Sequence, residues 1–182
     1  MSTPSTPEAP TEKYEASGSC HCGAIKFKAN NVDLSNVGRC NCTICTATGK
    51  LTTMLKPGDI SITNTPSGEP VVIRYANTTD VSLFPPELNY YSPAYHRGEC
   101  KKGEEWGRHF FCKTCSVNLF IVGNLPFNNI GEILGVNILA LDLKSLGKDL
   151  KEVVRPEKMR YVNGLDNTFV ASHGEPHPHG LW

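Results

Sequence analysis

The chain has 182 residues, eight of them cysteine, and equal numbers of basic and acidic residues, 18 of each. This length suits one domain with some appendage and is too short for a two-domain cofactor enzyme. The formal charge of zero counts against a protein that grips nucleic-acid phosphates, and the ordinary hydrophobic share of 39% excludes a disordered or membrane-embedded chain.

The first 13 residues are rich in proline, serine and threonine, which predicts a flexible tail before a domain that begins near Tyr14. This segment has neither the basic start nor the apolar core of a signal peptide. No later window reaches the roughly 18 uninterrupted apolar residues of a spanning helix. The sequence therefore predicts a cytoplasmic protein, with a nuclear location as the alternative, in a reducing compartment where disulfides are rare.

Short runs of alternating or β-branched residues predict strands separated by proline and glycine turns. The runs cover residues 24–29, 51–55, 60–63, 71–75, 117–122 and 133–141. One helix is predicted over 142–153, where apolar residues recur at helical spacing. These elements indicate a mainly β fold with short helical segments in a single domain, 14–165, followed by a C-terminal tail, 166–182.

Residues 78–107 form a long excursion between predicted strands, rich in aromatic residues. Loops of this length are uncommon and usually functional or disordered. We expect either a segment packed over the domain, as a lid or an interface, or a plain surface excursion. In the C-terminal tail, His173, His177 and His179 could bind metal adventitiously, although such a tail is more often a solvated terminus.

Seven of the eight cysteines fall into three tight clusters: Cys20 and Cys22, then Cys40, Cys42 and Cys45, then Cys112 and Cys115. Thiols one or two residues apart rarely close a relaxed disulfide, but they converge readily on zinc at about 2.3 Å. The two outer pairs would complete a closed four-thiolate structural site. The middle cluster supplies three ligands and leaves a fourth position for water or substrate.

Spacing alone does not assign these ligands. The middle cluster could be closed by Cys100, His96 or His109, which would leave no position for chemistry. His109 and His96 are also the nearby candidates for proton transfer. Arg108 could pair with a substrate carboxylate or could brace an acidic neighbour, and both interpretations remain open at this point.

Three motifs in order resemble the glutathione-dependent formaldehyde-activating enzyme and centromere protein V family, also called the GFA domain. They are Ser-Cys-His-Cys-Gly at 19–23, Arg-Cys-Asn-Cys-Thr-Ile-Cys at 39–45 with Gly49 after it, and Arg-His-Phe-Phe-Cys-Lys-Thr-Cys at 108–115. The resemblance extends over about residues 14–165. This sequence differs from the family pattern at Asn41, Thr46 and Ser116.

The resemblance implies a β-tent zinc-binding fold with two Zn²⁺ ions per chain. It places Cys20, Cys22, Cys112 and Cys115 on a structural zinc, and Cys40, Cys42 and Cys45 on a second, open zinc at which catalysis occurs. The implied activity is that of a carbon-sulfur lyase, in which glutathione and formaldehyde form the S-hydroxymethyl adduct or the reverse. Three thiolates leave the ion a poor Lewis acid that suits a sulfur ligand better than water.

Two other functions stay open: a non-catalytic, zinc-stapled module that binds a partner, and a family member recruited to a biosynthetic reaction on a bulkier substrate. The expected partners are a small thiol or carbonyl substrate, with nucleic acid and membrane disfavoured and an oligomer possible. A thiol or water exchanging on the second zinc would favour the enzyme. A closed shell would favour the module.

Overall fold

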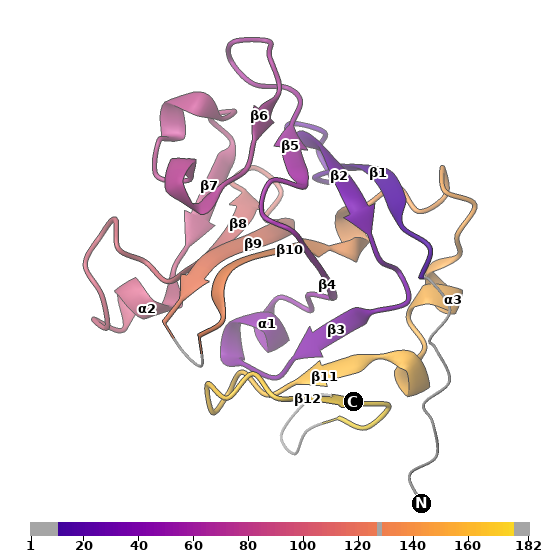
Figure 1. Cartoon of the computed structure of the whole chain (residues 1–182). Coiled ribbons are helices and arrows are strands. Elements are labelled where there is room, and N and C mark those ends of the chain that lie inside the picture. Colours follow the sequence, from indigo (N-terminus) through magenta and orange to yellow (C-terminus); the bar gives the residue numbers. More distant parts are fainter. Residues whose placement is uncertain (1–10, 127–128, 177–182) are drawn as a thin grey trace, which may run out of the picture.

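The computed structural model describes residues 11–126 and 129–176, and it confirms a mainly β single domain built from two sheets (Figure 1). The small sheet has the order β1-β2-β5-β6, with β1 at Tyr14–Ser19, β2 at Lys26–Val32, β5 at Ile60–Ile62 and β6 at Val71–Val72. All of its strand pairs are antiparallel.

The large sheet has eight strands in the order β12-β11-β3-β4-β10-β9-β8-β7. Their bounds are β3 Val37–Cys40, β4 Thr52–Leu55, β7 Leu88–Tyr91, β8 Gly107–Cys112, β9 Asn118–Leu125, β10 Gly131–Asn137, β11 Arg160–Val162 and β12 Ala171–His173. Every pair is antiparallel except β3 and β11, which run parallel. That parallel pair brings the chain just beyond residue 162 beside Cys40.

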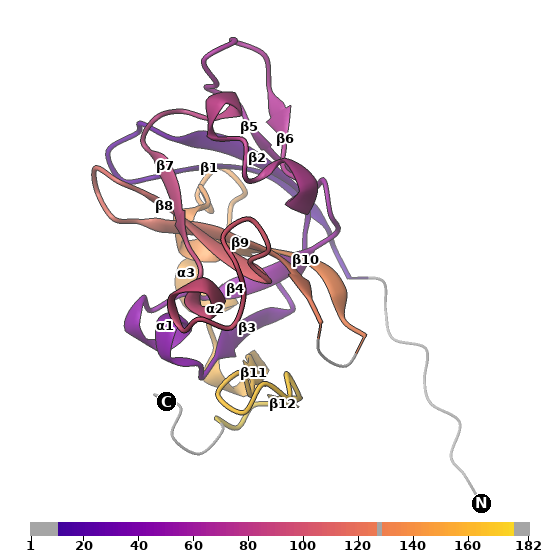
Figure 2. The same ribbon diagram turned by 90° about the vertical axis from the view of Figure 1, so that its left-hand side faces the viewer.

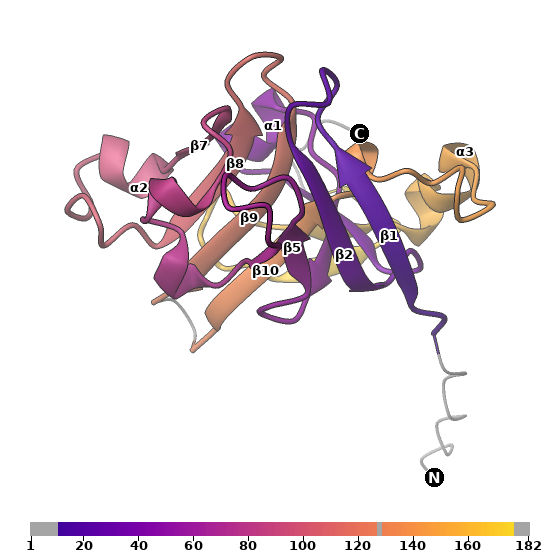
Figure 3. The same cartoon turned by 90° about the horizontal axis from the view of Figure 1, so that it is seen from above.

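The core lies where the small sheet covers the middle strands of the large one (Figure 3). In β2, Phe27 and Ala29 are buried while Lys26 and Lys28 are exposed, as the alternation in the sequence predicts. Phe27 meets Phe120 of β9 edge to face at 6.2 Å, and Phe120 stacks on Phe110 of β8 at 4.9 Å. Aromatic rings from both sheets therefore close the core.

The helices are short: α1 at Thr43–Ala47, α2 at Pro93–His96 and α3 at Leu150–Val153. The helix predicted over 142–153 is wrong for most of its length. Gly147, with φ +65°, ends a first turn, and Asp149 caps a new one by accepting a hydrogen bond from the Lys151 N–H. Among the described residues, no helix is long and apolar enough to cross a membrane.

The apolar run at 133–141 is likewise not one strand. It divides where β10 ends at Asn137, whose side chain accepts a hydrogen bond from the Leu139 N–H and starts a 3₁₀ turn at Ile138–Ala140. At the C-terminus the large sheet extends past residue 165, the predicted end of the domain, because β12 pairs with β11. His173 lies in β12; residues 1–10 and the other two tail histidines, His177 and His179, lie outside the described residues.

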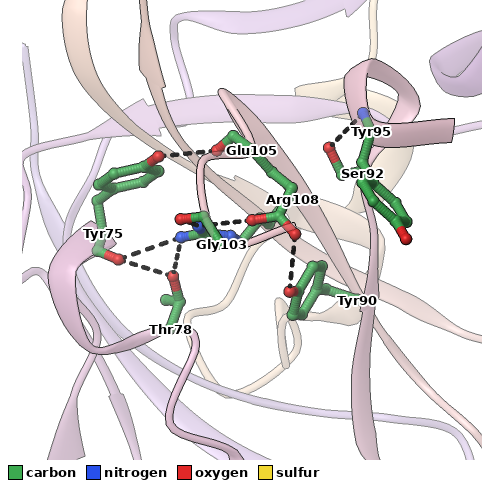
Figure 4. Close-up of polar contacts among 8 residues, drawn as sticks. All are labelled: Tyr75, Thr78, Tyr90, Ser92, Tyr95, Gly103, Glu105 and Arg108. Carbon is green, nitrogen blue, oxygen red and sulfur yellow. Dashed lines mark hydrogen bonds and ion pairs between the residues drawn. The ribbon is translucent and has the colours of Figure 1, made fainter. Parts of the chain in front are cut away.

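The excursion at 78–107 has structure of its own. It supplies β7, the edge strand that pairs with β8, and then α2, on the near side of the molecule in Figure 2. Ser92 caps α2 by accepting a hydrogen bond from the Tyr95 N–H (Figure 4). Pairing of Tyr91 with His109 places the start of α2 next to β8.

Candidate metal centres

The first group of thiols joins the two sheets. Cys20 and Cys22 lie in the turn between β1 and β2, and Cys112 and Cys115 lie at the end of β8 and in the turn that follows it. Their four Sγ atoms all lie within 4.8 Å of one another. Four thiolates bound at about 2.3 Å to a tetrahedral ion are about 3.8 Å apart, and Cys22 Sγ is 3.5 Å from Cys20 Sγ and 3.7 Å from Cys112 Sγ. This group could hold a metal ion such as zinc.

Backbone N–H groups point at these sulfurs, as a thiolate requires. The Ile25 N–H donates to Cys20 Sγ at 3.3 Å. The N–H of Val117, followed by that of Cys22, lowers the pKa of the Cys115 thiol to about 6. Donors aimed at sulfur stabilise the charged form, which is the form that binds metal. These backbone donors therefore favour anionic sulfur at Cys20 and Cys115.

The second group is built within six residues of chain. Cys40 ends β3, Cys42 is the residue before the first turn of α1, and Cys45 lies inside α1. Their Sγ atoms also lie within 4.8 Å of one another. Cys45 is buried, whereas Cys40 and Cys42 are partly exposed. A metal such as zinc could bind here with one face turned to solvent.

The three thiols of this group lie close enough to affect one another's pKa values. Bonds from Cys40 and Cys45 hold the pKa of Cys42 well below the usual thiol range, while the same bond to Cys42 raises the pKa of Cys40. A divalent cation binds thiolates, so it would displace the protons of these thiols.

The segment after β11 closes over this second group. Asn41 donates its backbone N–H to the Val162 carbonyl at 3.1 Å, and its side-chain oxygen accepts from the Leu165 N–H at 2.9 Å. A Cβ on Gly164 would clash with Cys40 Sγ and lie 3.2 Å from Cys42 Cβ. The close approach therefore requires glycine at 164, and Asn41 holds the segment in place through these two hydrogen bonds.

Other predicted candidates lie outside both groups. In the described chain, Cys100, His96 and His109 do not share a ligand cluster with Cys40, Cys42 and Cys45. His96 is exposed. None of these three residues therefore completes the middle cluster as a fourth ligand. The cluster keeps three ligands among the described residues.

His109 does lie near the second group but is already engaged. It is 5% exposed, and its Nδ1 is 2.9 Å from Nζ of Lys50, itself 2% exposed. Burial, and then the charge of Lys50, lowers the pKa of His109 to about 3, so the ring is neutral at physiological pH. The burial of Lys50 could not be predicted from the sequence, because a lone lysine after Gly49 carries no pattern that marks it as buried.

Arg108 braces the excursion and does not face a substrate site (Figure 4). It is 1% exposed and forms an ion pair with Glu105 at 2.9 Å. It also donates to the hydroxyl of Thr78 at 2.7 Å, and its guanidinium lies 4.5 Å from the ring centre of Tyr75. Of the two readings of Arg108, the structure supports pairing with an acidic neighbour.

Comparison with known proteins adds little to this geometry. No family model matches the chain, and none of the curated proteins does. Among solved structures, the chain is similar to a crystal structure of a Rhodobacter sphaeroides protein, a target of the Northeast Structural Genomics project. The identity is 21% and the TM-score is 0.47, over 76% of this chain and 95% of that one. A likeness at this level identifies no family.

Proposed function

We propose that the protein is a zinc-dependent enzyme of carbon-sulfur bond chemistry. Its substrate would be a thiol adduct of the glutathione S-hydroxymethyl type or a related small carbonyl compound. The observation that carries the proposal is the unequal number of ligands: within the described residues, one group brings together four thiols and the other three. An ion held by three thiolates keeps a coordination position free for a substrate.

In the proposed reaction a thiol adds to the carbonyl carbon of an aldehyde. A carbon-sulfur bond forms, the carbonyl double bond becomes a single bond to a hydroxyl, and the proton lost by the thiol ends on that oxygen; the reverse reaction breaks the same bond. A zinc ion bound by Cys40, Cys42 and Cys45 would keep the sulfur of the added thiol deprotonated at neutral pH, so that it can act as the nucleophile.

The residues of the chain have distinct parts in this proposal. Cys45 would hold the ion from the buried side, while Cys40 and Cys42, which are partly exposed, would present it to a small molecule from solvent. Gly164 and Asn41 keep the segment after β11 packed against the sulfurs. Arg108 lies outside the reaction, because its guanidinium is buried against Glu105 and Thr78.

The resemblance to the formaldehyde-activating enzyme and centromere protein V family supports the same proposal. The cysteine clusters occur in the family's order, and that family's β-tent fold carries a structural and a catalytic zinc. The cytoplasmic location and the small-molecule substrate belong to the proposal as well. A chromatin-binding role is disfavoured by the zero formal charge.

The test measures adduct formation from glutathione and formaldehyde by zinc-loaded protein, together with its zinc content. We expect two zinc ions per chain and a rate above the uncatalysed reaction. Cys42→Ser should remove one ion and reduce that rate at least about a hundredfold. Cys100→Ser is the matched control, because Cys100 lies outside both thiol groups, and it should change neither quantity.

Two results would contradict the proposal. A single zinc in the intact protein would exclude the open centre. Two zinc ions that bind no added thiol would favour the zinc-stapled binding module, since a closed coordination shell has no position for a substrate. If thiol binds but formaldehyde gives no adduct, other aldehydes should be tested, including bulkier ones.

A further inference from the structure

A buried pair of basic side chains, Lys50 and His109, lies beside the three-cysteine group and has no part in the function proposed above. Lys50 is 2% exposed and His109 5%. Burying a lysine ammonium is expensive unless it is paired, and lysine is among the side chains least often found fully buried. No carboxylate among the described residues forms an ion pair with Lys50 within 4.0 Å. Its burial needs another explanation.

The backbone anchors Lys50 next to Cys45. After α1 the chain reverses through Gly49, with φ +61°, whose N–H binds the Thr46 carbonyl at 3.2 Å. The N–H of Lys50 binds the carbonyl of Cys45 at 3.3 Å. These two bonds form the Schellman motif that commonly ends a helix. The same short helix therefore carries Cys45 and fixes the lysine that follows it.

His109 holds the lysine in place from the other side. It comes from β8, where it pairs with Tyr91 of β7 and Ile121 of β9. An ammonium can only donate hydrogen bonds, so Nδ1 of His109 accepts from Nζ of Lys50 at 2.9 Å, and the ring proton is on Nε2. A neutral ring adds no charge of its own. The pair therefore brings one positive charge to this place.

That charge lies in the same buried region as the sulfur of Cys45. Both side chains are buried, and the Lys50 N–H binds the Cys45 carbonyl at 3.3 Å. Three thiolates and one divalent ion carry a net charge near minus one, and a fourth thiolate would bring it near minus two. In a partly buried site, where charges interact more strongly than in water, a nearby ammonium lowers the free energy of that anionic complex.

We propose that Lys50, held by His109, is the charge-compensating residue that lets the three-cysteine centre take a thiolate, and not a neutral molecule, as its fourth ligand. The inference rests on the proposed function and deepens it, because it names an anionic sulfur as the species bound. The charge of Lys50 stabilises the anionic metal complex, and His109 holds the Lys50 ammonium in place. Neither transfers a proton in this account.

The experiment uses the full chain loaded with cobalt(II), whose visible and near-ultraviolet bands report thiolate coordination. Two added probes are titrated separately: 2-mercaptoethanol, which binds as an anion, and imidazole, which binds neutral. Lys50→Met should weaken 2-mercaptoethanol binding on the order of tenfold or more and leave imidazole binding within about twofold. Lys50→Arg, which keeps the charge, should bind the thiol more tightly than Lys50→Met does.

Lys56→Met is the matched control, because Lys56 is an exposed lysine in the turn after β4, and it should leave both affinities unchanged. Cobalt bands of the four-cysteine group report folding in every variant. Lys50→Gln gives a second neutral variant that still donates a hydrogen bond to His109. If neither neutral variant keeps those bands, Lys50 has a structural role and the proposal is overturned.

The remaining outcomes separate this inference from the proposed function. Equal weakening of both probes in Lys50→Met, or no weakening of either, overturns the role of Lys50 while the open centre stands. Failure of the wild-type protein to bind 2-mercaptoethanol at the second cobalt overturns the open centre itself. That result is recognised before any Lys50 variant is measured.

Discussion

The two thiol groups have similar chemistry but very different connections. The four-cysteine group ties a turn of the small sheet to a turn of the large one, with ligands as far apart as Cys20 and Cys115. The three-cysteine group lies within residues 40–45 and is covered by one neighbouring segment. An ion in the first site closes long loops and joins sheets, whereas an ion in the second closes a short one. Stability should therefore depend on the first and ligand exchange on the second.

The largest expected effect is on the first group. Cys112→Ser removes a buried ligand at the end of β8, and structural zinc sites contribute binding free energy on the order of 10 kcal/mol to folding. We expect loss of one zinc and loss of cooperative thermal unfolding, measured by metal analysis and circular dichroism. A folded variant with an unchanged melting temperature would show that the sheets do not need this ion.

A second, smaller effect should appear at the buried ion pair that anchors the excursion. Glu105→Gln leaves the guanidinium of Arg108 buried without its counter-charge, which should cost about 3–5 kcal/mol in denaturant unfolding. Both zinc ions should remain, because neither residue belongs to a thiol group. Glu104→Gln, at an exposed neighbouring position, is the control.

The ion pair between Glu105 and Arg108 should also make the stability of the fold depend on pH. Burial raises the pKa of Glu105, but the Gly103 backbone and Arg108 outweigh it, so the pKa lies below the usual glutamate value. A depressed folded-state pKa stabilises the fold at pH values above the unfolded value, about 4.3, and this stabilisation is lost as the pH falls through the folded value. The stability difference between wild type and Glu105→Gln should shrink across that acid range. A constant difference would contradict the assignment.

An intermediate effect is expected where the chain covers the second group. Gly164→Ala places a methyl group against Cys40 Sγ, so either the sulfur or the segment after β11 must move. We expect loss of about 1–3 kcal/mol and at least about tenfold weaker binding of one zinc, measured by chelator competition. Leu165→Ala, at the exposed next residue, should not change zinc affinity.

The smallest effect on the fold should come from the second group itself. Cys42→Ser is expected to remove one zinc yet change the free energy of unfolding by about 1 kcal/mol or less, because the site closes only a short loop. Denaturant unfolding alongside Cys100→Ser measures this. If Cys42→Ser destabilises the fold as much as Cys112→Ser does, stability does not depend mainly on the four-cysteine group, and the proposed difference between the two groups is contradicted.

Much of this architecture follows from local pattern. Alternation in the sequence placed the strand that contains Phe27, and its polar partners Lys26 and Lys28 face outward as expected. Hydrophobic periodicity gave the wrong boundaries where a polar side chain begins or ends an element. Asn137 ends β10 inside an apolar run, and Asp149 begins α3 after a turn. Such caps depend on single hydrogen bonds, which hydrophobic periodicity does not register.

The sequence by itself determined the number and spacing of the thiols, and hence three tight clusters along the chain. The tertiary structure joined the first and third clusters into a group of four and left the middle cluster as a group of three. Only the tertiary structure decided what surrounds them: Gly164 arrives through the parallel pairing of β3 with β11, and Lys50 meets His109 across 59 residues of chain. Ligand spacing is a local property that the order of residues specifies. Burial and charge at a site depend on which distant strands become neighbours, and pairing across the sheet sets that.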